Sequence, residues 1–444
     1  MTTPTSALPA PDAWNAAAGL RTRWLDNHER VDTLLGGLPT ALGRAGRAHC
    51  QHLLFDAVRH FGRIEAALAP LFVKPPRAKL RAALLITGGE LIDAGAAAAK
   101  DEGKTARIIH HAVERTKSFA SPAEARVVNA VARKLAVALA SSAAPGATAS
   151  SAELAAWFSH PEWLVQRWLT QFGPEQTRAL LEWNQQNAPV FTRWRDPQSP
   201  PPEWLKPTAW EHFFEVPVGH WSDVEALLAA GKLYLQDPAT RLAVGLLAPE
   251  PGETVLDLCA APGGKSLLIA DALAAGTTPT KGTGRIIALD LPGPRIDRLK
   301  ENLSRVGGVE VALVQGDAAL VDAKLFRAHG LPTEYTAILL DAPCTNTGVM
   351  RHRVDVKWRL QAGDFRKHGS QQLALIHAAA RLVAPGGRLV YSTCSVDQEE
   401  NERVVTEFFA SRAGGPFKLE QSVVSQPWAS GHDGAAAFLL RRTR

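Results

Sequence analysis

The sequence predicts an α/β protein: a doubly wound parallel sheet in the C-terminal part, preceded by an all-helical N-terminal part. Between residues 12 and 140, apolar residues recur at helical spacing and strand-like alternation is absent. From about residue 240, short apolar strands alternate with helical segments, which is typical of a parallel sheet covered by helices. The length of 444 residues exceeds one ordinary hydrophobic core, so we expect two or three domains.

The first predicted domain is all helical and spans residues 1–145. Helical spacing is clear in "HLLFDAVRHFGRIEAAL" and "EARVVNAVARKLAVALA". Cys50 lies on a predicted helix, and we expect it to pack in the core as a small apolar residue. The stretch "SSAAPGATASS" at 141–151 is small, polar and broken by Pro and Gly, which predicts a linker.

A tryptophan-rich segment, residues 152–240, follows as a predicted small connecting subdomain. Eight of the twelve tryptophans lie between Trp157 and Trp221. We expect most of them to fill a core, and the alternative is that some stack on exposed bases beside the interleaved arginines. The segment "DPQSPPPEW" at 196–204 predicts a loop.

The third predicted domain, residues 241–444, carries the alternating strands and helices. Strands are expected at 254–259, 284–290, 309–317, 335–343 and 388–394, with an edge strand at 435–442. Ligands bind beyond the carboxyl ends of such strands. Cys259, Cys344 and Cys394 each fall at or just past a strand end, which favours chemistry over packing.

Composition limits the function classes. Four scattered cysteines do not form a disulfide framework and predict a reducing, cytoplasmic location. The first 19 residues lack the pattern of a signal peptide, and no run of 18 apolar residues predicts a membrane span. A net charge of +5 favours an anionic partner such as nucleic acid.

Three strand ends together predict a nucleoside pocket. In "DLCAAPGGK" (257–265) a strand ends, small residues turn and a helix begins, so backbone N–H groups can face a ligand. Neither the G-x-G-x-x-G fingerprint nor the P-loop pattern is met. Asp290, ending the second strand, can accept hydrogen bonds from ribose hydroxyls, and Asp317, ending the third, can face the amino edge of adenine. Either acid alone could simply cap the next helix.

The motifs "DAPCTNTG" (341–348) and "STCS" (392–395) bring Asp341, Cys344 and Cys394 to one edge of the predicted sheet. Two cysteines without a second pair or a nearby histidine are poor zinc ligands, so no metal is expected. A reducing compartment argues against a disulfide. A thiolate can instead add to C6 of a pyrimidine, which makes C5 nucleophilic enough to take a methyl group.

These motifs, with "YSTCSVDQEENERVV", resemble the signatures of the Sun-type RNA (cytosine-5) methyltransferases, which use S-adenosylmethionine. Residues 104–135 are similar to the NusB-like RNA-binding domain of the bacterial ribosomal subtype, and 159–189 and 234–247 resemble its connecting segment. The resemblance implies a Rossmann-like class I methyltransferase domain. It also implies methyl transfer to C5 of a cytosine in RNA, with 16S (small-subunit) ribosomal RNA as the leading substrate, by a monomer.

The resemblance also implies roles for individual residues. Asp290 matches the ribose-binding acid and Asp317 the acid beside adenine. Cys394 matches the nucleophile, Cys344 the cysteine that assists product release, and Asp341 an acid near the methionine moiety and target base. The loop that would hold the methionine end of the cofactor is Cys259, Ala260, Ala261, Pro262, Gly263, Gly264 and Lys265, the last of which would also support the target base or the electrostatics of the site.

Three departures from the family pattern stand near these motifs. Thr345 and Asn346 replace the usual Ser-Gly, and Asn is tolerated where φ is positive, so we expect a shifted loop rather than an inactive site. Val354 replaces the usual proline before Asp355. After Asp290, the run "LPGPR" should delay the start of the next helix.

Two alternatives to the enzyme remain at this stage: a non-catalytic RNA-binding assembly factor that keeps the fold, and a dinucleotide-dependent oxidoreductase. The paired cysteines and three acids argue against the first, and the missing fingerprint argues against the second. Basic residues of the helical domain are expected to contact RNA backbone, with a solvated basic face as the plain alternative. They are Arg59, Arg63, Lys74, Arg77, Lys79 and Arg81.

Overall fold

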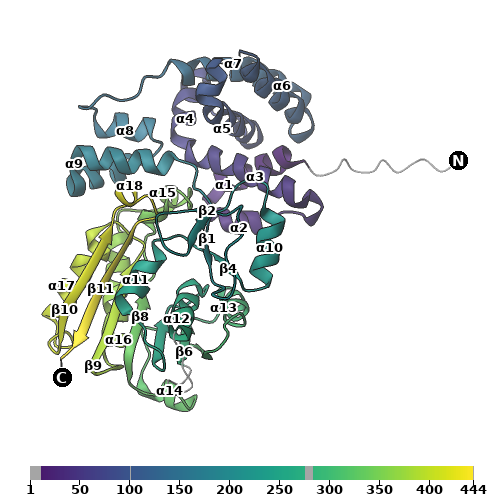
Figure 1. The fold of residues 1–444 in the computed structure, drawn as a ribbon. Coiled ribbons are helices and arrows are strands. Elements are labelled where there is room, and N and C mark those ends of the chain that lie inside the picture. Colours follow the sequence, from purple (N-terminus) through teal and green to yellow (C-terminus); the bar gives the residue numbers. More distant parts are fainter. Residues whose placement is uncertain (1–11, 101, 276–283, 444) are drawn as a thin grey trace. The chain divides into compact units, whose positions relative to one another are not determined.

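The computed structural model describes residues 12–100, 102–275 and 284–443 (Figure 1). The predicted lack of a signal peptide concerns a segment that lies mostly outside these residues. Among the helices of the described ranges, none has the length and apolar content that a bilayer crossing requires.

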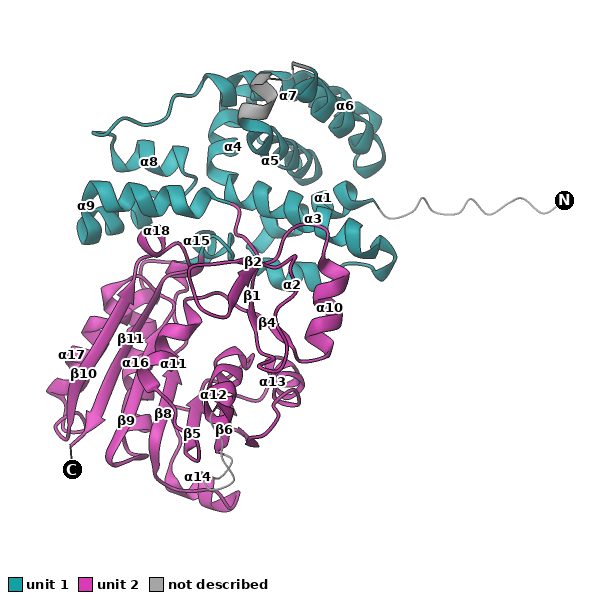
Figure 2. Cartoon of the chain, viewed as in Figure 1, with its two compact units in different colours: residues 1–186, 350–360 teal, residues 187–349, 361–444 magenta. Residues whose placement is uncertain are grey.

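The chain divides into two compact units (Figure 2). Unit 1 contains residues 1–186 and 350–360, and unit 2 contains residues 187–349 and 361–444. The predicted connecting segment 152–240 is therefore shared between the two units, and the three-part division of the chain stays a prediction.

Unit 1 is helical throughout its described residues, as the apolar spacing predicts. Its helices are α1 (Ala13–Asn27), α2 (Val31–Gly36), η1 (Thr40–Leu42), α3 (Gly43–Arg59), α4 (Phe61–Leu68), η2 (Ala69–Leu71), α5 (Ala78–Lys100), α6 (Glu102–Phe119), α7 (Pro122–Ser141), α8 (Ser151–Trp157), α9 (Glu162–Gln185) and α15 (Val356–Arg359).

Local chemistry explains several helix boundaries in unit 1. Ser121 caps α7 by accepting from the backbone N–H of Glu124, and Pro122 occupies the first helical position. Ser150 and Glu153 form a capping box at α8, so the predicted linker ends where that helix begins. Cys50 on α3 is fully buried in the helical core, as expected.

The short segment 350–360 folds into unit 1, although it follows the "DAPCTNTG" motif directly in the chain. Val354 is buried in the helical core, where a proline is usual in the family. The Nζ of Lys357 donates to the carbonyl of Arg59 at 2.9 Å, and the indole of Trp358 donates to the carbonyl of Val58 at 2.9 Å. Burial lowers the pKa of Lys357 well below its ordinary value, and Arg59 adds to this shift.

Unit 2 begins with a small antiparallel sheet that the sequence did not predict. Its strand order is β2-β3-β1-β4. Trp194 on β1 is buried, as core filling requires, and Arg193 and Arg195 both pair with Asp271 rather than facing solvent. The elements are β1 (Phe191–Trp194), β2 (Lys206–Pro207), β3 (Phe213–Glu215), α10 (Trp221–Ala229) and β4 (Leu233–Leu235), with the predicted loop between β1 and β2.

The rest of unit 2 is a seven-stranded sheet of order β10-β11-β9-β8-β5-β6-β7. Strands β7, β6, β5, β8 and β9 run parallel, whereas β11 and β10 are antiparallel additions. This is the predicted doubly wound sheet. The strands are β5 (Thr254–Leu258), β6 (Arg285–Asp290), β7 (Glu310–Gln315), β8 (Tyr335–Asp341), β9 (Val383–Thr393), β10 (Phe417–Ser425) and β11 (Ala435–Arg442).

The predicted edge position of residues 435–442 is wrong. Strand β11 pairs with β9 on one side and β10 on the other, and β10 lies at the edge. The sequence hid β10 because its side chains are mostly exposed and polar, so no apolar run marks it.

Helices cover both faces of the large sheet (Figure 1). One face packs against α11 (Thr240–Leu247) and α12 (Gly264–Ala274), with α13 (Arg295–Leu303) on the same side near β6. The opposite face packs against α14 (Ala323–Ala328), α16 (Asp364–Ala380) and α17 (Glu402–Ala410). Helix α13 starts only at Arg295, after "LPGP", as predicted. The remaining short helices of unit 2 are η3 (Thr347–Val349), η4 (Gln398–Glu400) and α18 (Pro427–Ser430).

Candidate active site

Three cysteines follow the ends of neighbouring strands of the large sheet. Cys259 follows β5, Cys344 lies three residues beyond β8, and Cys394 follows β9 directly. Strands β5, β8 and β9 are parallel neighbours, so their carboxyl ends meet at one edge of the sheet. The predicted placement at strand ends is confirmed.

Cys344 and Cys394 form a close thiol pair. Their sulfur atoms are 3.3 Å apart and both residues are free cysteines. The hydrogen bond with Cys394, and then burial, raise the pKa of Cys344 well above its ordinary value. A close pair of this kind resists double ionisation, because two thiolates would repel each other in a buried site.

A buried polar network holds the two loops that carry the thiols. The backbone N–H of Thr345 donates to Glu400 at 2.9 Å, and the Thr345 hydroxyl donates to the same carboxylate. The Thr347 hydroxyl donates to Asp397 at 2.7 Å, and the N–H of Gly348 donates to the carbonyl of Cys394 at 3.0 Å. Burial raises the pKa of Glu400, partly offset by the hydrogen bonds from Ser395 and Thr345. Both thiols therefore sit on loops that are tied together.

Lys265 and Asp341 form an ion pair beside the thiols. The Lys265 Nζ lies 2.6 Å from one Asp341 oxygen, and the Ser392 hydroxyl donates to the other at 2.9 Å. Burial disfavours the ammonium, but the Asp341 carboxylate outweighs this effect, and the pKa of Lys265 is raised. The ammonium also interacts electrostatically with Cys394. The sequence-predicted residues Lys265, Asp341, Cys344 and Cys394 thus lie together.

A cavity of about 240 Å³ opens beside the glycine-rich loop of residues 259–265, and we call it the loop cavity. Its lining includes part of the predicted cofactor loop, namely Cys259, Ala260, Ala261, Pro262, Gly264 and Lys265, together with Asp341. Gly263 has φ of +106°, and a Cβ there would approach Leu299 at 3.0 Å, so glycine is required although the residue does not line the cavity.

Asp290 and Asp317 lie at their predicted strand ends but do not line this cavity. Asp290 is buried, accepts from the N–H of Ala261 at 2.8 Å and pairs with Arg295 at 3.2 Å. Asp317 accepts from the N–H of Ala319 at 2.9 Å, a contact within a turn, and it does not cap the next helix, whose N-cap is Asp322. Their predicted ribose and adenine contacts stay predictions.

A second cavity, of about 60 Å³, adjoins the first. The two share Asp237, Thr240, Lys265 and Asp341. Cys394 lines the second cavity, whereas Cys344 does not. One thiol therefore faces open space that continues into the loop cavity, with the Lys265–Asp341 pair at the junction.

Comparison of the sequence with known proteins identifies the family of this chain. A family model described as 16S rRNA methyltransferase RsmB/F matches residues 244–431. The ribosomal RNA small subunit methyltransferase B of Sodalis glossinidius is 30% identical over 404 residues, which cover 87% of this chain and 86% of that protein. The chain belongs to the RsmB/F methyltransferase family. It is an S-adenosylmethionine-dependent RNA methyltransferase, as the motifs predict.

Other relatives agree over similar lengths. Ribosomal RNA small subunit methyltransferase B of Yersinia enterocolitica is 28% identical over 411 residues, covering 88% of each chain. The crystal structure of PH0851 shares the fold, with a TM-score of 0.71, 22% identity and coverage of 98% of this chain and 99% of that one. NSun6 from Pyrococcus horikoshii, solved with SFG, has a TM-score of 0.53 at 20% identity and covers 64% of this chain and 98% of that one.

The family motifs did not reveal two residues that contact the glycine-rich loop from another part of the chain. Tyr234 and Gln236, on and just after β4, both line the loop cavity. The amide of Gln236 donates to the carbonyl of Gly264 at 3.0 Å. Asn302 donates from its amide both to the Tyr234 hydroxyl at 3.1 Å and to the carbonyl of Pro262 at 2.7 Å. Their only sequence signal was "YLQDPATRLAVGLL", which resembles the family's connecting segment and gives no hint of a cavity wall.

Asp237 and Asp257 were also missed as site residues. Asp237 lines both cavities, and Asp257 lines the loop cavity while accepting from the Ser266 hydroxyl at 2.5 Å. Burial raises the pKa of Asp257 to about 7, partly offset by the hydrogen bond from Ser266. Asp257 lies among apolar residues in its strand. The sequence alone therefore does not show that its carboxyl group belongs to a site.

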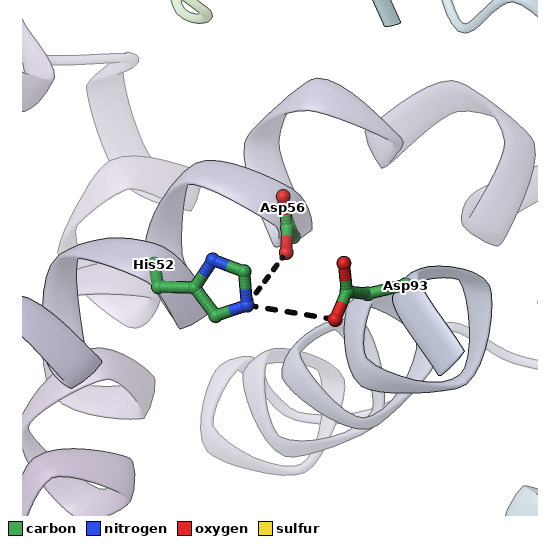
Figure 3. A group of neighbouring side chains, drawn as sticks. All are labelled: His52, Asp56 and Asp93. Atoms are coloured by element: carbon green, nitrogen blue, oxygen red, sulfur yellow. Dashed lines mark ion pairs between the residues drawn. The ribbon is translucent and has the colours of Figure 1, made fainter. Parts of the chain in front are cut away.

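Unit 1 contains a separate cluster of possible metal ligands: His52 and Asp56 on α3 and Asp93 on α5 (Figure 3). The Nε2 of His52 lies 3.4 Å from Asp56 and 3.6 Å from Asp93. The other oxygen of Asp56 pairs with the buried Arg59 at 2.5 Å. Ion pairs with His52 and Arg59 therefore already account for this arrangement.

The predicted role of Arg59 in holding RNA backbone is wrong, because its side chain is only 3% exposed and paired with Asp56. Arg63 packs over the ring of Trp157, and Arg81 pairs with Glu65. Arg77 is 82% exposed, and Lys74 and Lys79 are also exposed. The RNA contact of these exposed residues stays a prediction.

Proposed function

We propose that this protein transfers a methyl group from S-adenosylmethionine to C5 of a cytosine in 16S ribosomal RNA, through a covalent bond between Cys394 and C6. One observation carries the proposal. Cys394 lines a cavity that continues into the loop cavity, and the Cys344 sulfur lies 3.3 Å behind it. The family supplies the substrate class, since its relatives are named as small-subunit ribosomal RNA methyltransferases.

The lining of the loop cavity, which includes small side chains of a glycine-rich turn at a strand end, fits the cofactor. S-adenosylmethionine, when bound, supplies an electrophilic methyl group. The loop from Cys259 to Lys265 would hold its methionine end, with Asp290 and Asp317 as the proposed ribose and adenine acids. The Lys265–Asp341 pair lies at the junction of the two cavities, where the methyl group must meet the base.

The target cytosine must enter the second cavity unstacked, because a stacked base hides C6 from attack. The Cys394 sulfur, as a thiolate, then forms a bond to C6. The electron pair of the C5=C6 bond moves to C5, and C5 takes the methyl group. The nearby Lys265 ammonium favours negative charge on the attacking sulfur before the bond forms.

Release requires loss of the C5 proton, return of the electron pair to the C5=C6 bond and departure of the Cys394 thiolate. We assign the removal of this proton to Cys344 or to a water molecule that it positions. While Cys394 carries negative charge, Cys344 stays protonated because the two sulfurs interact. Once Cys394 is a neutral thioether, that restraint on Cys344 is removed: Cys344 can then give its own proton to water and, as a thiolate, accept the C5 proton.

The same proposal includes a monomeric protein without a resident metal, as the sequence predicts. The proposal also includes a cytoplasmic location, which a ribosomal RNA substrate supports. The alternative of a non-catalytic assembly factor does not account for two thiols brought into contact at the mouth of a cavity.

A trapping experiment tests the proposal. Cys344→Ala is expressed in cells, the protein is denatured, and the RNA that remains covalently attached is sequenced. We expect an adduct at a cytosine of small-subunit ribosomal RNA that disappears in the Cys344→Ala/Cys394→Ala double variant. An adduct that persists without Cys394, or full methyl transfer by Cys394→Ala, would contradict the assignment of the nucleophile.

A further inference from the structure

We propose that Asn346 is a further residue of the reaction centre, whose side-chain amide accepts a hydrogen bond from Cys394 and holds this nucleophile in its protonated resting form. The inference rests on the proposed role of Cys394 and adds a group that neither the motifs nor the relatives assign. It follows from the orientation of one amide and from the rigidity of the loop that carries it.

The backbone at Asn346 places its side chain next to the thiols. Its φ is +63°, in the left-handed region, and Asn adopts this conformation more readily than most residues. The positive φ on which the expected tolerance of Asn depends is therefore present. Neighbouring contacts hold the loop on both sides: Thr345 is bonded to Glu400, and Gly348 donates to the carbonyl of Cys394.

The hydrogen bonds of the amide determine which way it points. Its Nδ2 donates to the carbonyl of Cys344 at 2.8 Å, and a carbonyl can only accept, so the nitrogen must be on that side. The Oδ1 then faces Cys394, whose thiol donates to it at 3.5 Å. Because an amide oxygen cannot donate, this contact favours the protonated thiol over the thiolate.

The Cys394 sulfur is consequently placed between two groups with different roles. Its proton points to Asn346, which leaves the sulfur lone pairs to accept from the Cys344 thiol 3.3 Å away. Asn346 thus opposes ionisation, whereas the Lys265 ammonium favours it.

Two variants that both tolerate positive φ test this role in opposite directions. Asn346→Gly removes the acceptor and suits the backbone, so the pH midpoint for alkylation of Cys394 should fall by about 0.5 to 1 unit. Asn346→Asp keeps the shape but puts a carboxylate beside the sulfur, and the midpoint should rise by about 1 unit or more. His212→Gly is the matched control, because His212 also has a positive φ, of +64°, and lines neither cavity.

The measurement is the rate of iodoacetamide labelling of Cys394 in the full-length protein between pH 5 and 10, read on the Cys394 peptide by mass spectrometry. The pH profile of single-turnover methyl transfer is recorded in parallel. Midpoints that move in opposite directions for the two variants, with His212→Gly unchanged, support the proposal. An unchanged midpoint in Asn346→Gly, or a common shift of both variants, would overturn it and leave Asn346 a loop residue only.

The two proposals fail separately. If Cys394→Ser methylates RNA normally, Cys394 is not the nucleophile, yet the labelling midpoints still report on the contact with Asn346. If the pH midpoints for labelling of Cys394 do not move while Cys394→Ser is inactive, the proposed function is supported and the proposed role of Asn346 is wrong.

Discussion

The glycine-rich loop and the thiol pair lie at the same edge of one sheet and both carry cysteine, yet their surroundings differ. Cys259, in the loop, is half-buried beside Asp290, Asp341 and Asp257, and its desolvation, followed by these three carboxylates, raises its pKa. Cys394 instead lines a cavity with a thiol, an amide and an ammonium near it. Residue type and strand-end position are the same, so desolvation together with the neighbouring charges decides which cysteine can react.

The two regions also differ in how they are built. The loop is one continuous stretch, from Cys259 to Lys265, that a local motif reveals. The thiol pair joins residues fifty positions apart, and its geometry depends on Glu400, Asp397 and Asn346. A change in the loop should therefore affect cofactor binding, whereas a change in the network should affect chemistry with the cofactor bound.

The largest expected effect is the difference in methyl-transfer activity between variants of Cys394 and Cys259. Cys394→Ala should lower methyl transfer by about 10³-fold or more, because the covalent route is lost. Cys259→Ala should retain activity within about tenfold, since this thiol is held protonated by its surroundings. Single-turnover assays with radiolabelled S-adenosylmethionine measure both. Equal losses in the two variants would remove the distinction between the regions.

The second-largest expected effect concerns Glu400, which holds the loop of Cys344 through its hydrogen bonds with Thr345. Glu400→Gln replaces an acceptor that binds both Thr345 groups with an amide that can accept on one side only. Unfolding free energy should fall by about 1–3 kcal/mol. Methyl transfer should fall about 10- to 100-fold through misplacement of the thiols, while affinity for S-adenosylmethionine is unchanged. Chemical denaturation measures the unfolding free energy, and isothermal calorimetry measures the affinity for S-adenosylmethionine. A matching loss of cofactor affinity would contradict a role of Glu400 that is confined to the thiol loops.

On the loop side, Tyr234→Phe should weaken S-adenosylmethionine binding about 3- to 10-fold, because Asn302 loses one partner of the bridge to the Pro262 carbonyl. Tyr335→Phe is the control: its hydroxyl donates to the carbonyl of Pro332 at 2.6 Å, and the residue lines neither cavity. Cofactor Kd should be unchanged in the control. If the two variants bind equally well, β4 is not part of the cofactor wall.

The smallest effect concerns the pH dependence of stability. Burial raises the pKa of Asp257 to about 7, above the value of about 4 expected in the unfolded chain. The protonated form therefore stabilises the fold fully below about pH 4, and this contribution is lost as pH rises to about 7. Asp257→Asn, which can still accept from Ser266, should flatten the change in unfolding free energy between pH 5 and 8. An identical slope in wild type and variant would show that Asp257 does not titrate in this range.

The sequence by itself determined the fold class, the helical first part, the strand-and-helix alternation and the residues that follow each strand. These features depend on local periodicity and on turn chemistry, which neighbouring residues carry. The cysteines at strand ends were predictable for the same reason.

Only the tertiary structure decided which of these residues act together. Burial of Arg59, the inner position of β11 and the inclusion of residues 350–360 in unit 1 depend on packing partners distant in the chain. The contact of Cys344 with Cys394, the Asn346 amide beside the nucleophile and the wall supplied by Tyr234 and Gln236 do so as well. The distances between such residues, and the electrostatic interactions that depend on them, are determined only when the strands pair, because no local pattern in the chain encodes them.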